Sequence, residues 1–398
     1  MRSFIFSSDP RRFSFILLAV FGLIAGTVLL GRQAFRQVGD LLPEAEVVAL
    51  QQAYEGTCLY HSAALDNHPA YKAALYTARK TPVVALGSSR VLQINEKMFR
   101  APFTNLGRTL VHFNDLFVWL RRLEAMGPPK IVLLGVDFWW FNPAISPGRG
   151  KAGQLVSAVP FKLGYLRTLA SELVRYPQLL AGLPAALLEP PACPLGIMAR
   201  QFRDGFGPDG FRYRGFSLTA TRPYQASDYR FSASLPLIRK SKKSFRHGQD
   251  YDAGRVRRFI SAIKAAERRG MTIIMFFPPL APTITRAMAD SHGYAYIGKA
   301  VAALKRAGLK IHDFRNPDRV NASDCEFYDG FHQGDAVQAR IIAQIARREP
   351  LLKKVLDERE TGRVAAITGL AGIYQRDVFG DRETDFLGLG CKKPSGGG

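Results

Sequence analysis

The fold of this chain is indicated most directly by residues 82–90, which read PVVALGSSR. The apolar run at 83–86 is continuous, without the polar alternation of a half-exposed strand, and this pattern is typical of a strand buried on both faces. Gly87 ends the run, and Ser88 and Ser89 follow where we expect the chain to turn into a helix. The segment therefore predicts a buried strand with two serines at its carboxyl end.

Similar short apolar runs recur along the chain, and small or polar residues end each of them. They lie at Ala101–Thr104, Lys130–Leu134, Met271–Phe277 and Leu309–Ile311. Between several of them lie amphipathic stretches suited to helices, at 111–126, 255–269 and 336–347. This alternation predicts an α/β fold, a doubly wound parallel sheet with crossover helices. In such sheets, functional groups gather at the carboxyl ends of the strands.

The composition is that of a globular protein with one unusual feature, its charge. The chain has 398 residues, 47% of them hydrophobic and 22% charged, which is enough for a buried core in one large domain or two ordinary ones. The formal net charge is +22. A charge of this sign suits nucleic acid, anionic lipid or an acidic polymer, and it is also compatible with an ordinary solvated basic surface.

Residues 13–30, FSFILLAVFGLIAGTVLL, form an apolar stretch without a charge. As a helix they would span about 27 Å, close to the ~30 Å hydrocarbon core of a bilayer. Arg2, Arg11 and Arg12 precede the stretch, which favours residues 1–12 in the cytoplasm and the remainder outside. A cleaved signal peptide and a buried core helix are the alternatives, although no small-residue cleavage motif follows. An exported chain meets no chromosome, so we expect no nucleic-acid partner.

After the apolar stretch, the chain divides into three parts, and the second of them contains an insertion. Residues 31–80 predict a polar, helical juxtamembrane segment, and residues 81–350 the α/β domain. Residues 143–250 interrupt the alternation with frequent Gly, Pro and Arg, and we interpret them as an insertion that forms a lid, a polymer-contacting surface or a solvated loop. The pattern fades over residues 351–398, which predicts a partly disordered C-terminal extension.

The four cysteines predict no metal site. They are widely scattered and form no Cys-x-x-Cys pair, and no His lies at ligand spacing. In an oxidising compartment one or two disulfides would be expected, but the sequence leaves their pairing open. The positions are Cys58, Cys193, Cys325 and Cys391.

A candidate catalytic group joins the first predicted strand to residues 327–332, which read FYDGFH. Acyl transfer needs a nucleophile, a base within hydrogen-bond reach and a carboxylate that fixes the tautomer of the base. We assign these roles to Ser89, His332 and Asp329, with Ser88 as the alternative nucleophile. Each residue also has a plainer interpretation, because the serines and Asp329 suit helix caps and His332 suits a surface position.

With these segments the chain resembles the SGNH (GDSL-like) hydrolase superfamily over roughly residues 80–345. The Gly-Ser-Ser form, the membrane anchor and the run GVDFWW are most similar to a membrane-anchored branch of bacterial envelope proteins. That branch includes D-alanyl transfer proteins of teichoic acid synthesis and acetyl transfer proteins of exopolysaccharides. The resemblance implies a flavodoxin-like sheet, Ser89 as the nucleophile and no metal or organic cofactor. The matching blocks are Leu86–Ser89, Asn105–Gly107, Leu134–Asp137 and Asp329–His332.

The resemblance also implies an oxyanion hole, and here the chain departs from the family pattern. The family uses the serine N–H, a glycine of the second block and an asparagine of the third. Asp137 occupies the asparagine position, and an ionised Asp would repel an oxyanion. Gly107 is only a nearby substitute for the usual glycine. We therefore expect Gly107, Asn105 and Asp137 to be oxyanion or pocket residues, with Asp137 ordering the pocket or weakening catalysis.

These inferences predict a single-pass protein of the bacterial inner membrane with a periplasmic α/β domain. We expect an acyl esterase or O-acyltransferase that acts on a cell-envelope polysaccharide. The charge favours an anionic envelope glycan or a lipid surface as partner, and the resemblance adds a membrane-bound acyltransferase. The alternatives are a non-catalytic envelope protein that binds glycan or an acyltransferase, and a polybasic membrane tether with an incidental α/β domain. Trp139 and Trp140 we interpret as packing aromatics rather than a sugar-stacking platform.

Overall fold

The computed structural model describes residues 10–62, 68–148, 174, 191–220 and 228–393, and a five-stranded parallel sheet lies at its centre. The spatial order of the strands, β2-β1-β3-β6-β7, is the order of flavodoxin-like sheets, whose switch point lies between β1 and β3. All four pairings are parallel, which confirms the predicted class. The strands are β1 (Val83–Leu86), β2 (Phe103–Leu106), β3 (Ile131–Gly135), β6 (Thr272–Phe277) and β7 (Ile311–Asp313).

Both faces of this sheet are covered, because alternate residues of a strand point to opposite sides. Val83 and Ala85 of β1 belong to one hydrophobic core, whereas Val84 and Leu86 belong to another. The second core also takes apolar residues from α4 (Asp115–Met126), α10 (Ala253–Arg268) and α12 (Ala295–Arg306). The first core takes them from α11 (Pro282–Asp290), α13 (Asp335–Ala346) and α15 (Glu358–Ala365).

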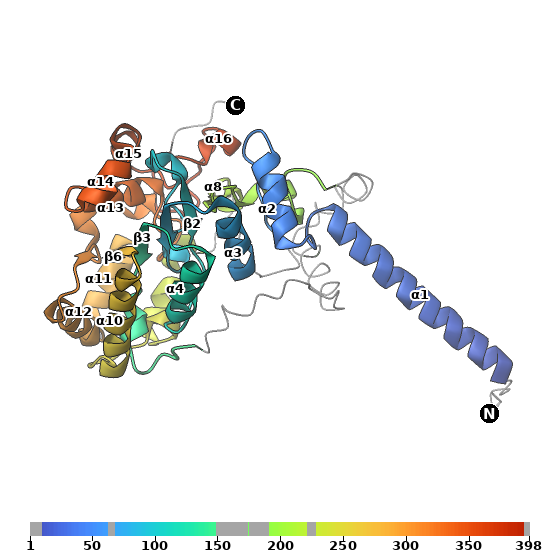
Figure 1. Ribbon diagram of the computed structural model, residues 1–398, viewed down its shortest axis with the longest axis horizontal. Coiled ribbons are helices and arrows are strands. Elements are labelled where there is room, and N and C mark those ends of the chain that lie inside the picture. Colours follow the sequence, from blue (N-terminus) through green and yellow to red (C-terminus); the bar gives the residue numbers. More distant parts are fainter. Residues whose placement is uncertain (1–9, 63–67, 149–173, 175–190, 221–227, 394–398) are drawn as a thin grey trace.

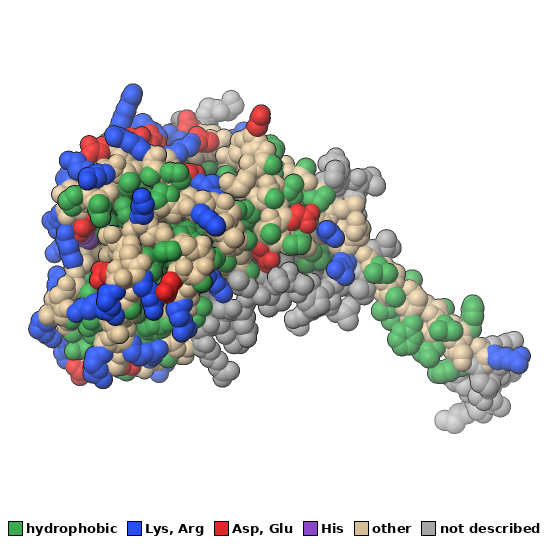
Figure 2. Space-filling view, viewed as in Figure 1, with side chains coloured by type: hydrophobic (Ala, Val, Ile, Leu, Met, Phe, Trp, Pro, Cys, Tyr) green, Lys and Arg blue, Asp and Glu red, His purple; other side chains and the backbone are tan. Residues whose placement is uncertain are grey.

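Helix α1 (Pro10–Gln37) projects away from the globular part of the molecule (Figure 1). Among the described residues it is the one helix long and apolar enough to cross a membrane, with a mean hydropathy of 2.6 and 0% of its most apolar window buried. Phe15 and Leu23 on it are 74% and 73% exposed. Figure 2 shows hydrophobic side chains along α1, in contrast to the many Lys and Arg side chains on the globular part. Exposure of this kind is costly in water and is removed in a bilayer.

The segment after α1 contains the predicted helices, α2 (Glu44–Ala53) and α3 (His68–Arg79). It is more than a polar connection, because α3 is packed into the domain. Tyr71 is 1% exposed and Lys72 is fully buried. The Nζ atom of Lys72 donates to the backbone carbonyl oxygens of Asn105 at 2.8 Å and Gly210 at 2.5 Å. This lysine therefore fastens α3 both to β2 and to the predicted insertion.

The described parts of the predicted insertion form small elements around an antiparallel hairpin. Residues 149–173, 175–190 and 221–227 of it lie outside the described residues. The disulfide Cys58–Cys193 joins the insertion to the loop after α2, and the backbone of Tyr60 pairs with Phe206. Its described elements include α7 (Ile197–Phe202), β4 (Asp204–Phe206), β5 (Arg212–Arg214), α8 (Gly215–Leu218) and α9 (Ser234–Arg239).

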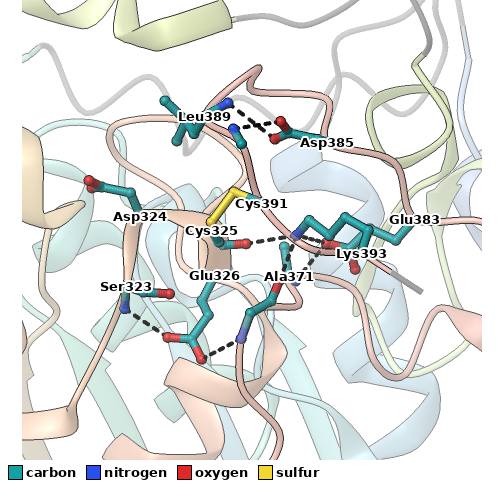
Figure 3. Close-up of a disulfide and its surroundings, with 12 residues drawn as sticks. Ser323, Asp324, Cys325, Glu326, Ala371, Glu383, Asp385, Leu389, Cys391 and Lys393 are labelled. Atoms are coloured by element: carbon teal, nitrogen blue, oxygen red, sulfur yellow. Dashed lines mark hydrogen bonds and ion pairs between the residues drawn. A yellow bond between two sulfur atoms is a disulfide. The ribbon is translucent and has the colours of Figure 1, made fainter. Parts of the chain in front are cut away.

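The described part of the C-terminal extension forms short helices and a disulfide, and residues 394–398 lie outside the described residues. The partial disorder expected for the extension stays a prediction. From residue 350 onward, the described residues include α14 (Pro350–Val355), α15 and α16 (Arg376–Phe379). The disulfide Cys325–Cys391 ties the end of the extension to the loop that precedes Asp329 (Figure 3).

Further contacts around this disulfide hold the described end of the extension against the domain. Lys393 Nζ donates to the carbonyl oxygen of Cys325 at 2.9 Å and pairs with Glu383 at 2.5 Å (Figure 3). The bridge spans a sequence separation of 66. In the chain-entropy model, it lowers the conformational entropy of the unfolded chain and thereby stabilises the fold by about 4 kcal/mol. These stabilising contacts join residues far apart in the chain, and local periodicity does not report them.

Candidate active site

Ser89, His332 and Asp329 form a continuous hydrogen-bonded chain. The Nε2 atom of His332 lies 2.7 Å from Oγ of Ser89. The Nδ1 atom of the same ring lies 2.7 Å from Oδ2 and 2.9 Å from Oδ1 of Asp329. A proton on Nδ1 would be donated to the carboxylate, leaving Nε2 as the acceptor for the serine hydroxyl. The structure thus brings together the three residues that the sequence singled out, in the nucleophile–base–carboxylate order.

The nucleophile position follows from the tight turn after β1. Ser89 is the first residue of the short 3-10 helix η1 (Ser89–Val91). A Cβ atom on Gly87 would lie 2.9 Å from Cγ1 of Val91, so this turn requires glycine. Ser88 is 7% exposed and caps η1, accepting a hydrogen bond from the N–H of Arg90 at 3.3 Å. Of the two serines, the structure places Ser89 against the histidine.

Asp329 is held by its own loop. Its Oδ1 atom accepts the N–H of Phe331 at 2.8 Å and of His332 at 2.9 Å. The N–H of Tyr328 donates to the carbonyl oxygen of His332 at 2.9 Å, which closes the loop. Burial opposes ionisation of Asp329, but the neighbouring His332, these hydrogen bonds and Arg214 outweigh it and hold the pKa of the carboxyl well below its usual range. An ionised Asp329 can orient the imidazole and stabilise its protonated form.

Asp137 forms a buried ion pair rather than facing the nucleophile. It is 1% exposed, and its Oδ1 atom accepts from Nη1 of Arg90 at 3.1 Å. Arg90 Nη2 donates to the carbonyl oxygens of Pro278 at 2.5 Å and Pro279 at 2.8 Å. Burial raises the pKa of Asp137 to about 6, while Arg90 acts in the opposite direction. Above that pH the guanidinium balances the carboxylate, and the pair connects the carboxyl ends of β1, β3 and β6.

We expect Asp137→Asn to lower the free energy of unfolding by about 3–5 kcal/mol, because it leaves the Arg90 guanidinium charged, buried and without its counter-ion. Denaturant unfolding of the full chain in detergent micelles measures the change. The matched double variant Arg90→Met/Asp137→Leu removes both charges and should lie much closer to the wild type. An Asp137→Asn variant as stable as the wild type would show that the pair does not secure the strand ends.

Asn105 and Gly107 stabilise the turn that carries Ser89. The Nδ2 atom of Asn105 donates to the carbonyl oxygens of Val91 and Ile94, each at 2.8 Å. Its Oδ1 atom accepts the N–H of Gly107 at 2.8 Å. The N–H of Gly107, which we expected to donate to an oxyanion, therefore already donates to a side chain of the neighbouring strand β2. Neither these two residues nor Asp137 is among the described residues that line the pocket beside Ser89.

The candidate triad opens into a pocket of about 930 Å³, with Ser89 and His332 in its wall. This volume is at the upper end for small-molecule pockets and suits a ligand larger than a simple acyl ester. Trp139 also lines the pocket, whereas Trp140 is 1% exposed in the core. Both tryptophans pack against the core, as expected, but Trp139 also has a surface that a ligand can reach.

Several residues of this region were not identified from the sequence. Arg90 directly follows the candidate nucleophile, and a charged residue at the end of an apolar strand was a usable signal for a buried ion pair. Arg212 and Arg214 line the pocket and stand two apart on β5. The alternation Arg-Tyr-Arg was the available signal, because residues two apart on a strand share a face.

Among the described residues, no group of three or more His, Cys, Asp or Glu side chains is placed to hold a metal ion. No protein-family model matches the chain, and no curated protein matches it. Fold and site define a mixed α/β protein with a parallel sheet and a hydrogen-bonded Ser-His-Asp group, and with one candidate membrane-spanning helix in the described part of the chain.

Proposed function

We propose that the protein is a membrane-anchored serine esterase or O-acyltransferase of the SGNH type that acts on a cell-envelope polysaccharide. The observation that carries this proposal is the contact of 2.7 Å between Ser89 Oγ and His332 Nε2, with Asp329 on the other side of the ring. Such a chain of contacts activates a serine that is otherwise a weak nucleophile. We propose an envelope polysaccharide as the acceptor because the sequence resembles envelope acyl-transfer proteins.

In the proposed reaction, Ser89 Oγ attacks the carbonyl carbon of an ester while His332 Nε2 takes the hydroxyl proton. The tetrahedral intermediate collapses, the alkoxide leaves with that proton, and the acyl group remains as an ester on Ser89. Water or a glycan hydroxyl then attacks this ester and gives its proton to His332. Serine departs with that proton, which yields a free acid in hydrolysis or an acylated glycan in transfer.

Two features support the proposed compartment. Helix α1 is long and apolar enough to span a bilayer, and the cations before it favour a cytoplasmic N-terminus. All four cysteines are paired, as Cys58–Cys193 and Cys325–Cys391, which suits an oxidising compartment. We place the domain on the periplasmic side of a bacterial inner membrane. There the net charge of +22 favours an anionic glycan or lipid surface, and a membrane-bound acyltransferase could supply the acyl donor.

The test is to locate a covalent adduct. Full-length protein in detergent micelles is treated with a serine-reactive fluorophosphonate, and the modified peptide is identified by mass spectrometry. We expect an adduct on Ser89 in the wild type and in the matched variant Ser88→Ala, and none in Ser89→Ala. Turnover of p-nitrophenyl acetate should follow the same order. A folded wild type that forms no adduct, or forms it on Ser88, would contradict the assignment.

A non-catalytic envelope protein is the second candidate, and one observation favours it. Of the three residues expected near an oxyanion, Gly107 and Asn105 engage each other and Asp137 engages Arg90. A binding protein would retain glycan affinity while giving no serine adduct. The labelling experiment therefore separates the two candidates.

A further inference from the structure

The wall of the pocket beside Ser89 carries charge of one sign. Five of its residues are Lys or Arg, and no Asp or Glu is among the described residues that line it. A low-dielectric cleft lined by one sign of charge concentrates ions of the opposite sign. Four of the five come from the predicted insertion. The cationic residues are Arg108, Arg212, Arg214, Lys243 and Arg246.

Two of these arginines are placed by the β4–β5 hairpin. Arg212 and Arg214 stand two apart on β5 and therefore point to the same face, while Tyr213 between them packs into the core. The hairpin is fixed by antiparallel pairing, with Asp204 opposite Arg214 and Phe206 opposite Arg212. The insertion thus presents two guanidinium groups from one rigid element.

The guanidinium of Arg212 is buried and only partly satisfied. The residue is 8% exposed, and its Nη2 atom pairs with Asp204. Its Nη1 atom and the Nε atom of Arg214 are buried and have no hydrogen-bond partner among the described residues. Buried donors of this kind are normally paired, so each unpaired one requires an explanation. Both arginines line the pocket, so an anionic ligand there would place acceptors beside these incompletely satisfied guanidinium groups.

The second arginine connects this cationic wall to the catalytic loop. The Cζ atom of Arg214 lies 4.9 Å from the centre of the Tyr328 ring, and Tyr328 directly precedes Asp329. Arg214 also contributes to the low pKa of Asp329. A ligand group held by Arg214 would therefore lie close to the residues that carry the chemistry.

We propose that Arg212 and Arg214 form an anion-binding subsite for a carboxylate or phosphate group on the glycan that Ser89 acts on. Lys243 and Arg246, both exposed at the pocket, extend the subsite toward neighbouring units of the polymer. Arginine is suited to this role because its planar fork matches the geometry of both groups. The assignment rests on the proposed function for the identity of the ligand as a glycan, but its test is independent of turnover.

The experiment measures binding by isothermal titration calorimetry to full-length protein in detergent micelles, with Ser89→Ala to exclude turnover. The probes are trigalacturonate, its methyl ester as the neutral match, and a glycerol phosphate trimer. We expect the Kd of trigalacturonate or of the phosphate trimer to be at least about tenfold below that of the ester, since a charge-assisted hydrogen bond contributes about that much. The tighter of the two anions identifies the group as carboxylate or phosphate.

The variants test whether the named arginines cause the preference. Arg214→Gln should remove most of the difference between the anions and the ester, and Lys243→Gln/Arg246→Gln should reduce it. Arg212→Gln is a poorer probe because it also removes the guanidinium that pairs with the buried Asp204. The matched control is Arg268→Gln, which removes an exposed positive charge at the end of α10. Arg268 lies near the amino end of β6, whereas the pocket lies at the carboxyl ends of the strands, so this variant should leave every Kd unchanged.

The outcomes separate this proposal from the proposed function. Equal affinity for the anions and the ester would overturn the subsite, even if the fluorophosphonate labels Ser89. A preference that falls as much in Arg268→Gln as in Arg214→Gln would overturn it too, because the cause would then be net charge. A preference that depends on Arg214, without labelling of Ser89, would support the subsite while contradicting the acyl-transfer chemistry.

Discussion

His332→Ala is expected to lower kcat for p-nitrophenyl acetate by about 10⁴- to 10⁶-fold, the range found when one member of a serine triad is removed. Nε2 of His332 is 2.7 Å from Ser89 Oγ, and alanine leaves no group there to take the serine proton. The measurement is steady-state hydrolysis by full-length protein in micelles. The exposed His292, replaced by Asn because its φ of 50° is one that Asn tolerates, is the control and should retain wild-type turnover.

The same prediction extends to the combination of two changes. Residues of a triad act as a unit, so Ser89→Ala/His332→Ala should be no slower than either single variant. Added imidazole should restore part of the turnover in His332→Ala, where Ser89 is still present, and none in the double variant. Losses that multiply in the double variant would contradict a shared role for the two residues.

The central sheet could be predicted because its strands are buried on both faces and therefore continuously apolar. The expected run at Lys130–Leu134 corresponds to β3 at Ile131–Gly135. The strand expected from Ala101 begins instead at Phe103. Pro102 has no N–H to contribute to the ladder, and this accounts for the later start.

The candidate triad could be predicted for a related reason, since its serine lies at a strand end and its Asp and His lie within one short motif. The contacts around it could not. Arg90 and Asp137 are 47 positions apart, and Cys325 and Cys391 are 66 apart. No local pattern specifies which distant residue satisfies a buried charge or closes a disulfide. The cationic pocket wall could not be predicted either. It contains a hairpin from a segment that we expected to be a lid, a polymer-contacting surface or a solvated loop.

Asp329→Asn is expected to lower kcat by about 10⁴-fold while leaving the fold intact. Asp329 accepts from His332 Nδ1 at 2.7 Å, whereas an asparagine amide placed there can donate to that nitrogen. The imidazole proton would then move to Nε2, the atom that must accept from Ser89. The exposed Asp290, changed to Asn at the end of α11, is the matched control and should retain its turnover. Retention of more than a tenth of wild-type kcat in Asp329→Asn would contradict the orienting role.

The pH dependence of stability gives a second, non-catalytic measure of the same residue. The folded pKa of Asp329 lies below its ordinary value of 3.8, so its ionised form stabilises the folded protein above about pH 4. That contribution is lost as the pH falls through the depressed pKa and the carboxylate binds a proton. Asparagine has no such proton to take up, so Asp329→Asn should lose less unfolding free energy than the wild type between about pH 5 and pH 2. Equal losses in the two proteins would mean that the pKa of Asp329 is not depressed in the folded protein.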